Sequence, residues 1–249
     1  MSYPVALLRR RPVRSFLVVI ASISLTVATS SLAPTAPRAE GIADRPNAVI
    51  VGDSITASHE PFIQSAFERQ GIPGIIIAAH GARRISESYV YNGEFIPSGV
   101  SAVRDLQARG IDPRLWVIEL GTNEILPMLG CSCPDQLAFA DDLIGEMLNT
   151  LGPAAQVAWV TTSFRTAPLA TNTFNEALRR RAAVDPRMTL SDWHALTVTH
   201  PGWFKDPVHP NDWGGLVLTS LYIDTVSKLL APPLPPPSPH SHADRLGMF

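Results

Sequence analysis

The chain has 249 residues, of which 45% are hydrophobic and 17% are charged, with 20 Lys and Arg against 22 Asp and Glu. This length fits one sizeable hydrophobic core or at most two small ones, and the composition excludes a chain that is disordered throughout, a collagen and a multi-span membrane protein. Residues 1–39 hold five arginines and no acid, so the remainder has 15 basic against 22 acidic residues, which disfavours binding to nucleic acid or to anionic lipid.

The first 39 residues have the pattern of a secretory signal peptide. An Arg-rich stretch precedes an apolar run from Phe16 to about Val27, and small residues follow up to Ala36 and Ala39. The apolar run is shorter than the ~20 residues of a membrane-spanning helix, so cleavage near Ala36 or Ala39 is favoured over a permanent N-terminal anchor. We therefore expect a signal peptide over 1–39, a linker over 40–46, and an exported protein without a stable membrane span after cleavage.

Beyond the linker, short apolar runs rich in β-branched residues alternate with segments of helical spacing. Such runs are typical of strands buried on both faces of a parallel sheet. The predicted strands are 48–51, 75–78, 115–118, 157–160 and 188–191. The predicted helices are Phe62–Gln70, Val100–Arg109, Gln136–Leu151, Thr173–Ala183 and Trp213–Leu230. The order predicts one α/β domain over 47–230, a three-layer α/β/α sandwich with a mainly parallel five-stranded sheet.

The last residues, 231–249, contain six prolines and are expected to form an extended, disordered tail. The two cysteines, Cys131 and Cys133, are separated by one residue, which is too close for an easy disulfide. A strained redox pair, one half of a metal site and two surface thiols remain open, and two surface thiols are favoured.

Chemically useful residues follow the predicted strands, where ligands bind on parallel α/β sheets. Ser54 follows the first strand, Gly81 the second and Asn123 the third, while Asp206 and His209 precede the last helix. A serine becomes nucleophilic when a histidine removes its proton, and a carboxylate can hold that histidine in the correct tautomer. Backbone N–H groups near glycine and a side-chain amide can stabilise an oxyanion.

These four blocks, in this order over 47–230, resemble the SGNH (GDSL-type) serine hydrolases, whose fold is flavodoxin-like. The resemblance implies that Ser54 is the nucleophile, His209 the base and Asp206 the residue that orients it. It also implies an oxyanion hole made by the N–H groups of Ser54 and Gly81 and the Asn123 amide, with no cofactor and no metal. The sequence departs from the family pattern at Ile55, where Leu is usual, and at Glu124, where Asp is commoner.

Several neighbouring residues have alternative interpretations. His194 and His200 compete with His209, and a metal site made of His200, Asp206 and His209 is a minor alternative. Arg83 and Arg84 could bind a polar or anionic substrate group, but solvated surface is favoured for both. Trp193, Trp203 and Trp213 could contact sugar rings, but packing is favoured for at least two of them.

The sequence thus predicts a secreted serine esterase that hydrolyses carboxylic esters of small molecules, including O-acyl groups on carbohydrates or lipids, through a Ser-His-Asp triad and an acyl-enzyme. The segment Asp192-Trp193 ahead of the Asp206–Pro210 block resembles family members that act on acylated carbohydrates. One alternative is an acyltransferase that moves the acyl group to a sugar hydroxyl. Another is an inactive extracellular binding protein on the same fold. Acyl length, physiological partner and oligomeric state are left open by the sequence.

Overall fold

A computed structural model of the chain describes residues 45–131 and 135–231. The predicted signal peptide, residues 40–44 of the predicted linker and all but the first residue of the predicted tail lie outside these ranges. Within them, no helix is long and apolar enough to cross a membrane.

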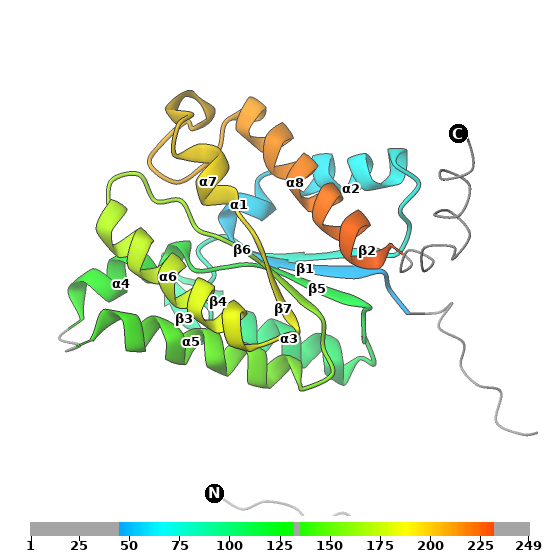
Figure 1. Cartoon of the computed structure of the whole chain (residues 1–249), viewed down its shortest axis with the longest axis horizontal. Helices are drawn as coiled ribbons and strands as arrows, with labels where there is room; N and C mark the ends of the chain where they lie inside the picture. The colour runs from blue at the N-terminus through cyan, green and yellow to red at the C-terminus, as the bar shows by residue number, and fades with distance from the viewer. Residues whose placement is uncertain (1–44, 132–134, 232–249) are drawn as a thin grey trace, which may run out of the picture. The chain divides into compact units, whose positions relative to one another are not determined.

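The centre of the fold is a parallel sheet with the strand order β2-β1-β5-β6-β7 (Figure 1). Its strands are β1 (Ala48–Gly52), β2 (Ile75–Ala79), β5 (Leu115–Glu119), β6 (Val157–Val160) and β7 (Met188–Ser191). Every residue of β1, β5 and β6 is buried. This burial explains why these strands read as continuous apolar runs, and all five predicted strands are confirmed.

Five long helices cover the two faces of this sheet (Figure 1). They are α2 (Glu60–Arg69), α3 (Gly99–Ala108), α5 (Gln136–Leu151), α6 (Pro168–Val184) and α8 (Asp212–Leu230). One hydrophobic cluster joins α3, α5 and α6 to Val49 and Val51, and the other joins α2 and α8 to Ala48 and Ile50. Alternate residues of β1 thus enter opposite cores, as the pleat requires. The predicted three-layer α/β/α sandwich is confirmed.

Several short elements were not predicted from the sequence. An antiparallel hairpin, β3 (Tyr89–Tyr91) and β4 (Glu94–Ile96), lies between β2 and α3. The short helices are α1 (Ser54–Ala57), η2 (Thr122–Glu124), α4 (Ile125–Gly130), α7 (Trp193–Thr197) and η3 (Pro201–Trp203). Elements this short contain too few residues to display a hydrophobic period. Their importance is positional, because α1, β3, η2 and α4 surround the candidate site.

The structure corrects the expectation of two surface thiols. Cys131 takes part in a disulfide bond, and the chain's other cysteine, Cys133, lies outside the described residues. The spacing alone could not decide this point, because the Cα separation and torsions that a disulfide needs depend on the local backbone, and Cys131 lies just beyond α4 in an extended conformation.

Candidate active site

Ser54 is held at the carboxyl end of β1, an inner strand of the sheet, by a tight turn into helix α1. It is the first residue of that helix, and the side chain of Asp53 caps the helix by accepting a hydrogen bond from the Ile55 N–H at 2.8 Å. The turn requires glycine at position 52, because a Cβ there would lie 2.4 Å from the Thr56 hydroxyl oxygen. The sequence Gly-Asp-Ser therefore fixes where the serine hydroxyl points.

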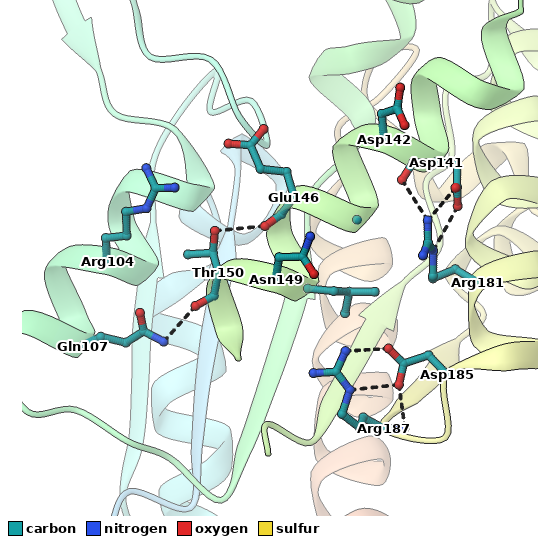
Figure 2. A pocket seen from close by; sticks show the side chains of 12 residues that line it. Arg104, Gln107, Asp141, Asp142, Glu146, Asn149, Thr150, Arg181, Asp185 and Arg187 are labelled. Atoms are coloured by element: carbon teal, nitrogen blue, oxygen red, sulfur yellow. Dashed lines mark hydrogen bonds and ion pairs between the residues drawn. The ribbon is translucent and has the colours of Figure 1, made fainter. Parts of the chain in front are cut away.

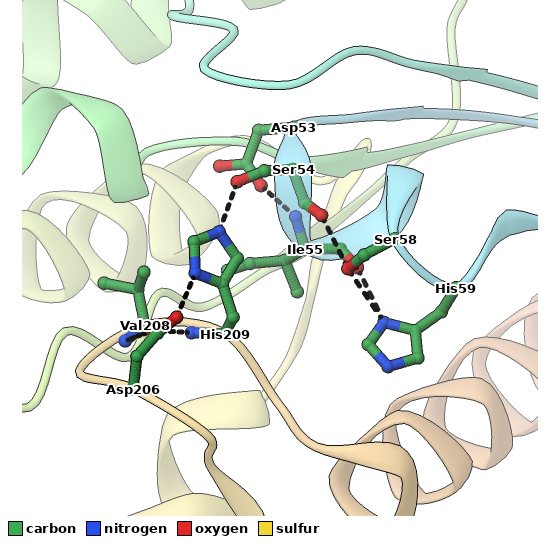
Figure 3. A network of polar contacts seen from close by, with 8 residues as sticks. All are labelled: Asp53, Ser54, Ile55, Ser58, His59, Asp206, Val208 and His209. Atoms are coloured by element: carbon green, nitrogen blue, oxygen red, sulfur yellow. Dashed lines mark hydrogen bonds and ion pairs between the residues drawn. The ribbon is translucent and has the colours of Figure 1, made fainter.

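The hydroxyl of Ser54 lies against His209, which in turn contacts Asp206 (Figure 3). His209 Nε2 is 2.9 Å from Ser54 Oγ, and His209 Nδ1 is 2.8 Å from Asp206 Oδ2. When Nδ1–H donates to the carboxylate, Nε2 is left as an acceptor for the serine proton. The structure therefore brings together the three residues that the sequence singled out, in the order that proton transfer needs.

Asp206 is set up to remain ionised beside His209. Partial burial alone would raise its pKa, but hydrogen bonds from the backbone N–H groups of His209 and Val208 and from the His209 ring outweigh burial and lower the pKa to about 2. The two backbone donors reach Asp206 Oδ1 at 2.8 and 2.9 Å. A carboxylate fixed by three donors orients the imidazole and stabilises its protonated form.

Two backbone N–H groups beside Ser54 are available to a ligand. Neither Ser54 N–H nor Gly81 N–H donates a hydrogen bond to another part of the chain that the structure describes. Gly81 follows β2, and the preceding His80 N–H donates to Gly52 O at 3.1 Å, which links this loop to the end of β1. Unpaired N–H groups at adjacent strand ends are suited to binding an oxyanion.

Asn123 is the third expected oxyanion donor, and the structure shows what holds it. Its amide nitrogen donates to Asp53 Oδ2 and to Arg83 O, each at 3.0 Å. The carboxamide has only two N–H groups, so both are engaged. To stabilise an oxyanion, Asn123 must share one of these hydrogens with the substrate or release it.

Behind Ser54 lies a buried pair of carboxyl groups that sequence reasoning missed. Glu119, the last residue of β5, is next to Asp53 and accepts a hydrogen bond from the Thr56 hydroxyl at 2.9 Å. Burial raises the pKa of Asp53 to about 6 and that of Glu119 well above its ordinary value. Two adjacent buried carboxyls share one proton. The Asp53 N–H donates to Glu119 Oε2 at 3.4 Å. The only sign of this pair in the sequence is that Glu119, an acid, ends an otherwise apolar run.

Arg83 corrects another expectation, because it is not solvated surface. The residue is buried, and its Nε donates to Pro97 O at 3.1 Å. Its Nη1 donates to the carbonyl oxygens of Gly52 and Ala78, which lie at the ends of two neighbouring strands. Burial lowers the pKa of Arg83 to about 10. Arg83 therefore braces the strand ends that carry the candidate site.

Within residues 45–131 and 135–231, no histidine other than His209 and no tryptophan forms a hydrogen bond with the Ser54 side chain. His200 stacks on Trp203, with ring centroids 4.0 Å apart. Trp193 is buried against Phe204 and Trp203 packs on the same cluster, so packing is confirmed for two of the three tryptophans. Trp213 is 62% exposed.

The candidate triad opens into a cavity of about 580 Å³. Its apolar wall comes from β3, α4 and the loops after β6 and before α8, and includes Tyr89, Tyr91, Leu126, Pro127, Phe164 and Val208. A second cavity, of about 660 Å³, lies between α3, α5 and α6 (Figure 2). The second cavity is lined mainly by charged side chains and contains neither Ser54 nor His209. The first cavity is therefore the candidate active site.

No protein-family model and no curated protein matches this chain. Solved structures do match. TesA is 20% identical, with a TM-score of 0.57 over 74% of this chain and 99% of its own. The C-terminal catalytic domain of peptidoglycan O-acetyltransferase A from Streptococcus pneumoniae is 18% identical, with a TM-score of 0.54 over 75% of this chain and 93% of its own. A G-D-S-L lipolytic protein from Veillonella parvula is 16% identical, with a TM-score of 0.53 over 71% of this chain and 96% of its own.

The chain has the fold of the SGNH hydrolases. In this SGNH fold, Ser54, Asn123 and the Asp206–His209 loop lie together around one cavity at one edge of the sheet. Fold alone does not assign an activity, so the chemistry has to come from the contacts around Ser54.

Proposed function

We propose that the protein is a serine hydrolase of the SGNH family that cleaves carboxylic esters through an acyl-enzyme. The observation that carries this proposal is the unbroken hydrogen-bond chain from Ser54 Oγ through His209 to Asp206 on the wall of a cavity. A serine activated in this way is the nucleophile of acyl-transfer chemistry.

Each step follows from these contacts. His209 Nε2 takes the proton as Ser54 Oγ attacks the ester carbonyl carbon, and the protonated imidazole is stabilised by Asp206. The oxyanion forms hydrogen bonds with the N–H groups of Ser54 and Gly81 and with one shared N–H of Asn123. His209 then passes the proton to the leaving alcohol, and water activated by the same imidazole releases the acid.

We infer that the substrate is an O-acyl ester of a carbohydrate or a lipid. A family 3 carbohydrate esterase from Clostridium thermocellum shares the fold, with 14% identity and a TM-score of 0.52 over 74% of this chain and 98% of its own. The cavity supports a substrate with a sizeable apolar or ring-shaped part beside the ester, because tyrosine and leucine side chains line it.

The acyl group could instead pass to a sugar hydroxyl, which would make the protein an acyltransferase. The similarity in fold to a peptidoglycan O-acetyltransferase domain favours keeping this second candidate. Product analysis with an acetyl donor in the presence and absence of a chitooligosaccharide acceptor separates the two. Free acetate alone supports hydrolysis, whereas an acetylated sugar supports transfer.

We also propose export, with residues 1–39 acting as a cleaved signal peptide. The support is the arginine-rich start followed by a short apolar run and small residues. N-terminal sequencing of the exported protein should find a start near residue 40. A protein that retains Met1 would contradict cleavage.

The proposed activity is tested with a fluorophosphonate probe, which reacts with activated serines without requiring the true substrate. We expect one adduct, on Ser54 by mass spectrometry, and its loss in Ser54→Ala and His209→Ala. Ser58→Ala is the matched control, because Ser58 is an exposed serine of the same segment. In this variant the adduct on Ser54 should persist. A folded protein without any adduct would favour the inactive binding protein.

A further inference from the structure

The candidate cavity has one fixed positive charge on its wall, and nothing in the proposed reaction uses it. Among the residues that line the cavity, Arg84 is the single lysine or arginine. It follows the buried Arg83 and is itself about a quarter exposed, with a side-chain exposure of 27%. Arginine is well suited to recognising a carboxylate, because its planar guanidinium presents a fixed fork of donors.

The protein holds Arg84 in a defined orientation. Its guanidinium lies over the Tyr89 ring, 4.4 Å from the ring centroid. Nη1 forms an ion pair with Glu87, a residue that is 63% exposed and does not line the cavity. Stacking and this ion pair fix the plane of the guanidinium before a ligand arrives, which lowers the entropic cost of binding.

The opposite edge of the guanidinium is unpaired. Nε is buried without a hydrogen-bond partner, and Nη2 donates no hydrogen bond to any residue that the structure describes. Nε–H and Nη2–H are parallel and together form the fork that matches the two oxygens of a carboxylate. Arg84 therefore keeps two adjacent donors, the buried Nε–H and Nη2–H, without a protein carboxylate.

Two other arginines show what this edge does when a carboxylate is present (Figure 2). Arg187 binds Asp185 through Nε at 2.9 Å and Nη2 at 2.6 Å. Arg181 uses the same two nitrogens to bind Asp141. In both cases the fork is filled by the protein itself, whereas the fork of Arg84 beside the candidate triad is not.

The nearby acids leave this position for a ligand. Asp206 lines the cavity, but it is already bonded to two backbone N–H groups and to His209. Glu124 is buried, its Oε1 accepts from the Ile85 N–H at 2.6 Å, and its Oε2 has no hydrogen-bond partner. The Arg84 charge acts on Glu124 by lowering its pKa, but the two side chains form no ion pair. Arg83 directs its donors to backbone carbonyls.

We propose that Arg84 forms a carboxylate-binding subsite, so that the preferred esters carry a carboxylate near the bond that is cleaved. This inference rests on the proposed function, because it uses the same cavity. A charge-assisted fork of two hydrogen bonds should contribute about 10- to 100-fold in affinity. The carboxylate can belong to the alcohol part or to the acyl part of the ester.

Two matched pairs of substrates distinguish these positions. On the alcohol side, 4-acetoxybenzoate is compared with phenyl acetate, and on the acyl side 4-nitrophenyl hydrogen adipate is compared with 4-nitrophenyl hexanoate. The measured quantity is the kcat/KM of the ester with the carboxylate divided by the kcat/KM of the ester without it, within each pair. Differences in intrinsic reactivity cancel when the ratio of a variant is divided by that of the wild type.

We expect Arg84→Gln to lower this ratio at least about tenfold for one pair, mainly through KM, since a fork of charged hydrogen bonds is lost. Arg84→Lys keeps the charge but not the fork, so its ratio should lie between those of the wild type and Arg84→Gln. Arg109→Gln removes an exposed cation at the C-terminal cap of α3 that does not line the cavity, and its ratio should equal that of the wild type. Equal losses for both members of each pair would overturn the subsite.

A binding measurement separates failure of the subsite from failure of the proposed function. By calorimetry, 4-acetamidobenzoate, which has an amide in place of the ester, should bind the wild type more tightly than acetanilide does, and Arg84→Gln should abolish the difference. If none of the four esters is hydrolysed but this difference is found, the subsite stands and the esterase proposal fails. If the esters are hydrolysed and neither pair shows a carboxylate preference, only the subsite is overturned.

Discussion

Two acidic environments flank Ser54, and they put the same kind of side chain into opposite states. On the open side, Asp206 is partly exposed, accepts three hydrogen bonds and has a pKa of about 2. On the buried side, Asp53 and Glu119 are shielded from water, and burial raises the pKa of both. The open side carries a negative charge, whereas the buried side carries a shared proton.

The difference shows that a carboxyl group near a nucleophile has a role set by its donors and its burial. Asp206 can stabilise a cation that forms on His209, because it is ionised and directly bonded to the ring. Asp53 cannot reach that ring and instead caps α1 and holds Asn123. Replacing an acid by its amide should therefore be severe on the open side and mild on the buried side.

The largest expected effect is on the open side. Asp206→Asn should lower kcat for phenyl acetate by about 10⁴, because an amide facing Nδ1 favours the tautomer that cannot accept the Ser54 proton. Asp212→Asn, an exposed acid in the first turn of α8, is the matched control and should behave as the wild type. Equal kcat values for Asp206→Asn and the wild type would remove Asp206 from the mechanism.

The next effect concerns the residue held between the two sides. Asn123→Ala should lower kcat by about 10²–10³ while KM changes little, as for other side-chain oxyanion donors. Steady-state kinetics on the same ester give both constants. A loss confined to KM would instead assign Asn123 to substrate binding, and no loss would mean that its N–H groups stay on Asp53 and Arg83 throughout the reaction.

The sharpest contrast comes from Glu119. Glu119→Gln keeps a neutral acceptor for the Thr56 hydroxyl and the Asp53 N–H and should retain most of kcat. Glu119→Leu leaves these two buried donors without an acceptor and should lose about tenfold, the cost of an unmade buried hydrogen bond. The acid-to-amide change is the same as at Asp206, with the opposite expected result. If Glu119→Gln were as inactive as Asp206→Asn, the buried pair would need a negative charge on Glu119 and the comparison would fail.

Much of this arrangement could be read from the sequence. Buried parallel strands are continuous apolar runs, so the five strands and the residues that follow them could be placed. The Asp206–His209 contact follows from a spacing of three residues in a loop. The positions of Ser54, Gly81 and Asn123 follow from the rule that parallel strands end at one edge.

What could not be read depends on contacts between distant segments. Arg83 looks like a surface residue until its donors meet the carbonyls of Gly52 and Ala78. Glu119 is an ordinary strand-end acid until β1 places Asp53 beside it. The open fork of Arg84 is visible only once Glu87 and Tyr89 are seen on its other edge and face.

The smallest expected effect is a pH dependence of stability from Glu124. Burial raises its pKa from 4.5 to about 8, so the folded state binds a proton that the unfolded state has already lost between these values. The stabilising contribution is therefore complete below about pH 4.5 and is lost as the pH rises through 8. Glu124→Gln cannot ionise, so its Tm should fall less than that of the wild type between about pH 6 and pH 9.

Because Asp53 and Glu119 also have raised pKa values, the wild-type slope has more than one source, and the test is the difference between slopes. Glu146→Gln, an exposed acid of α5, should keep the wild-type slope. Parallel slopes for Glu124→Gln and the wild type would show that the Glu124 carboxyl is already ionised near neutral pH. The buried side of Ser54 would then hold more negative charge than the shared proton allows, and the contrast with Asp206 would weaken.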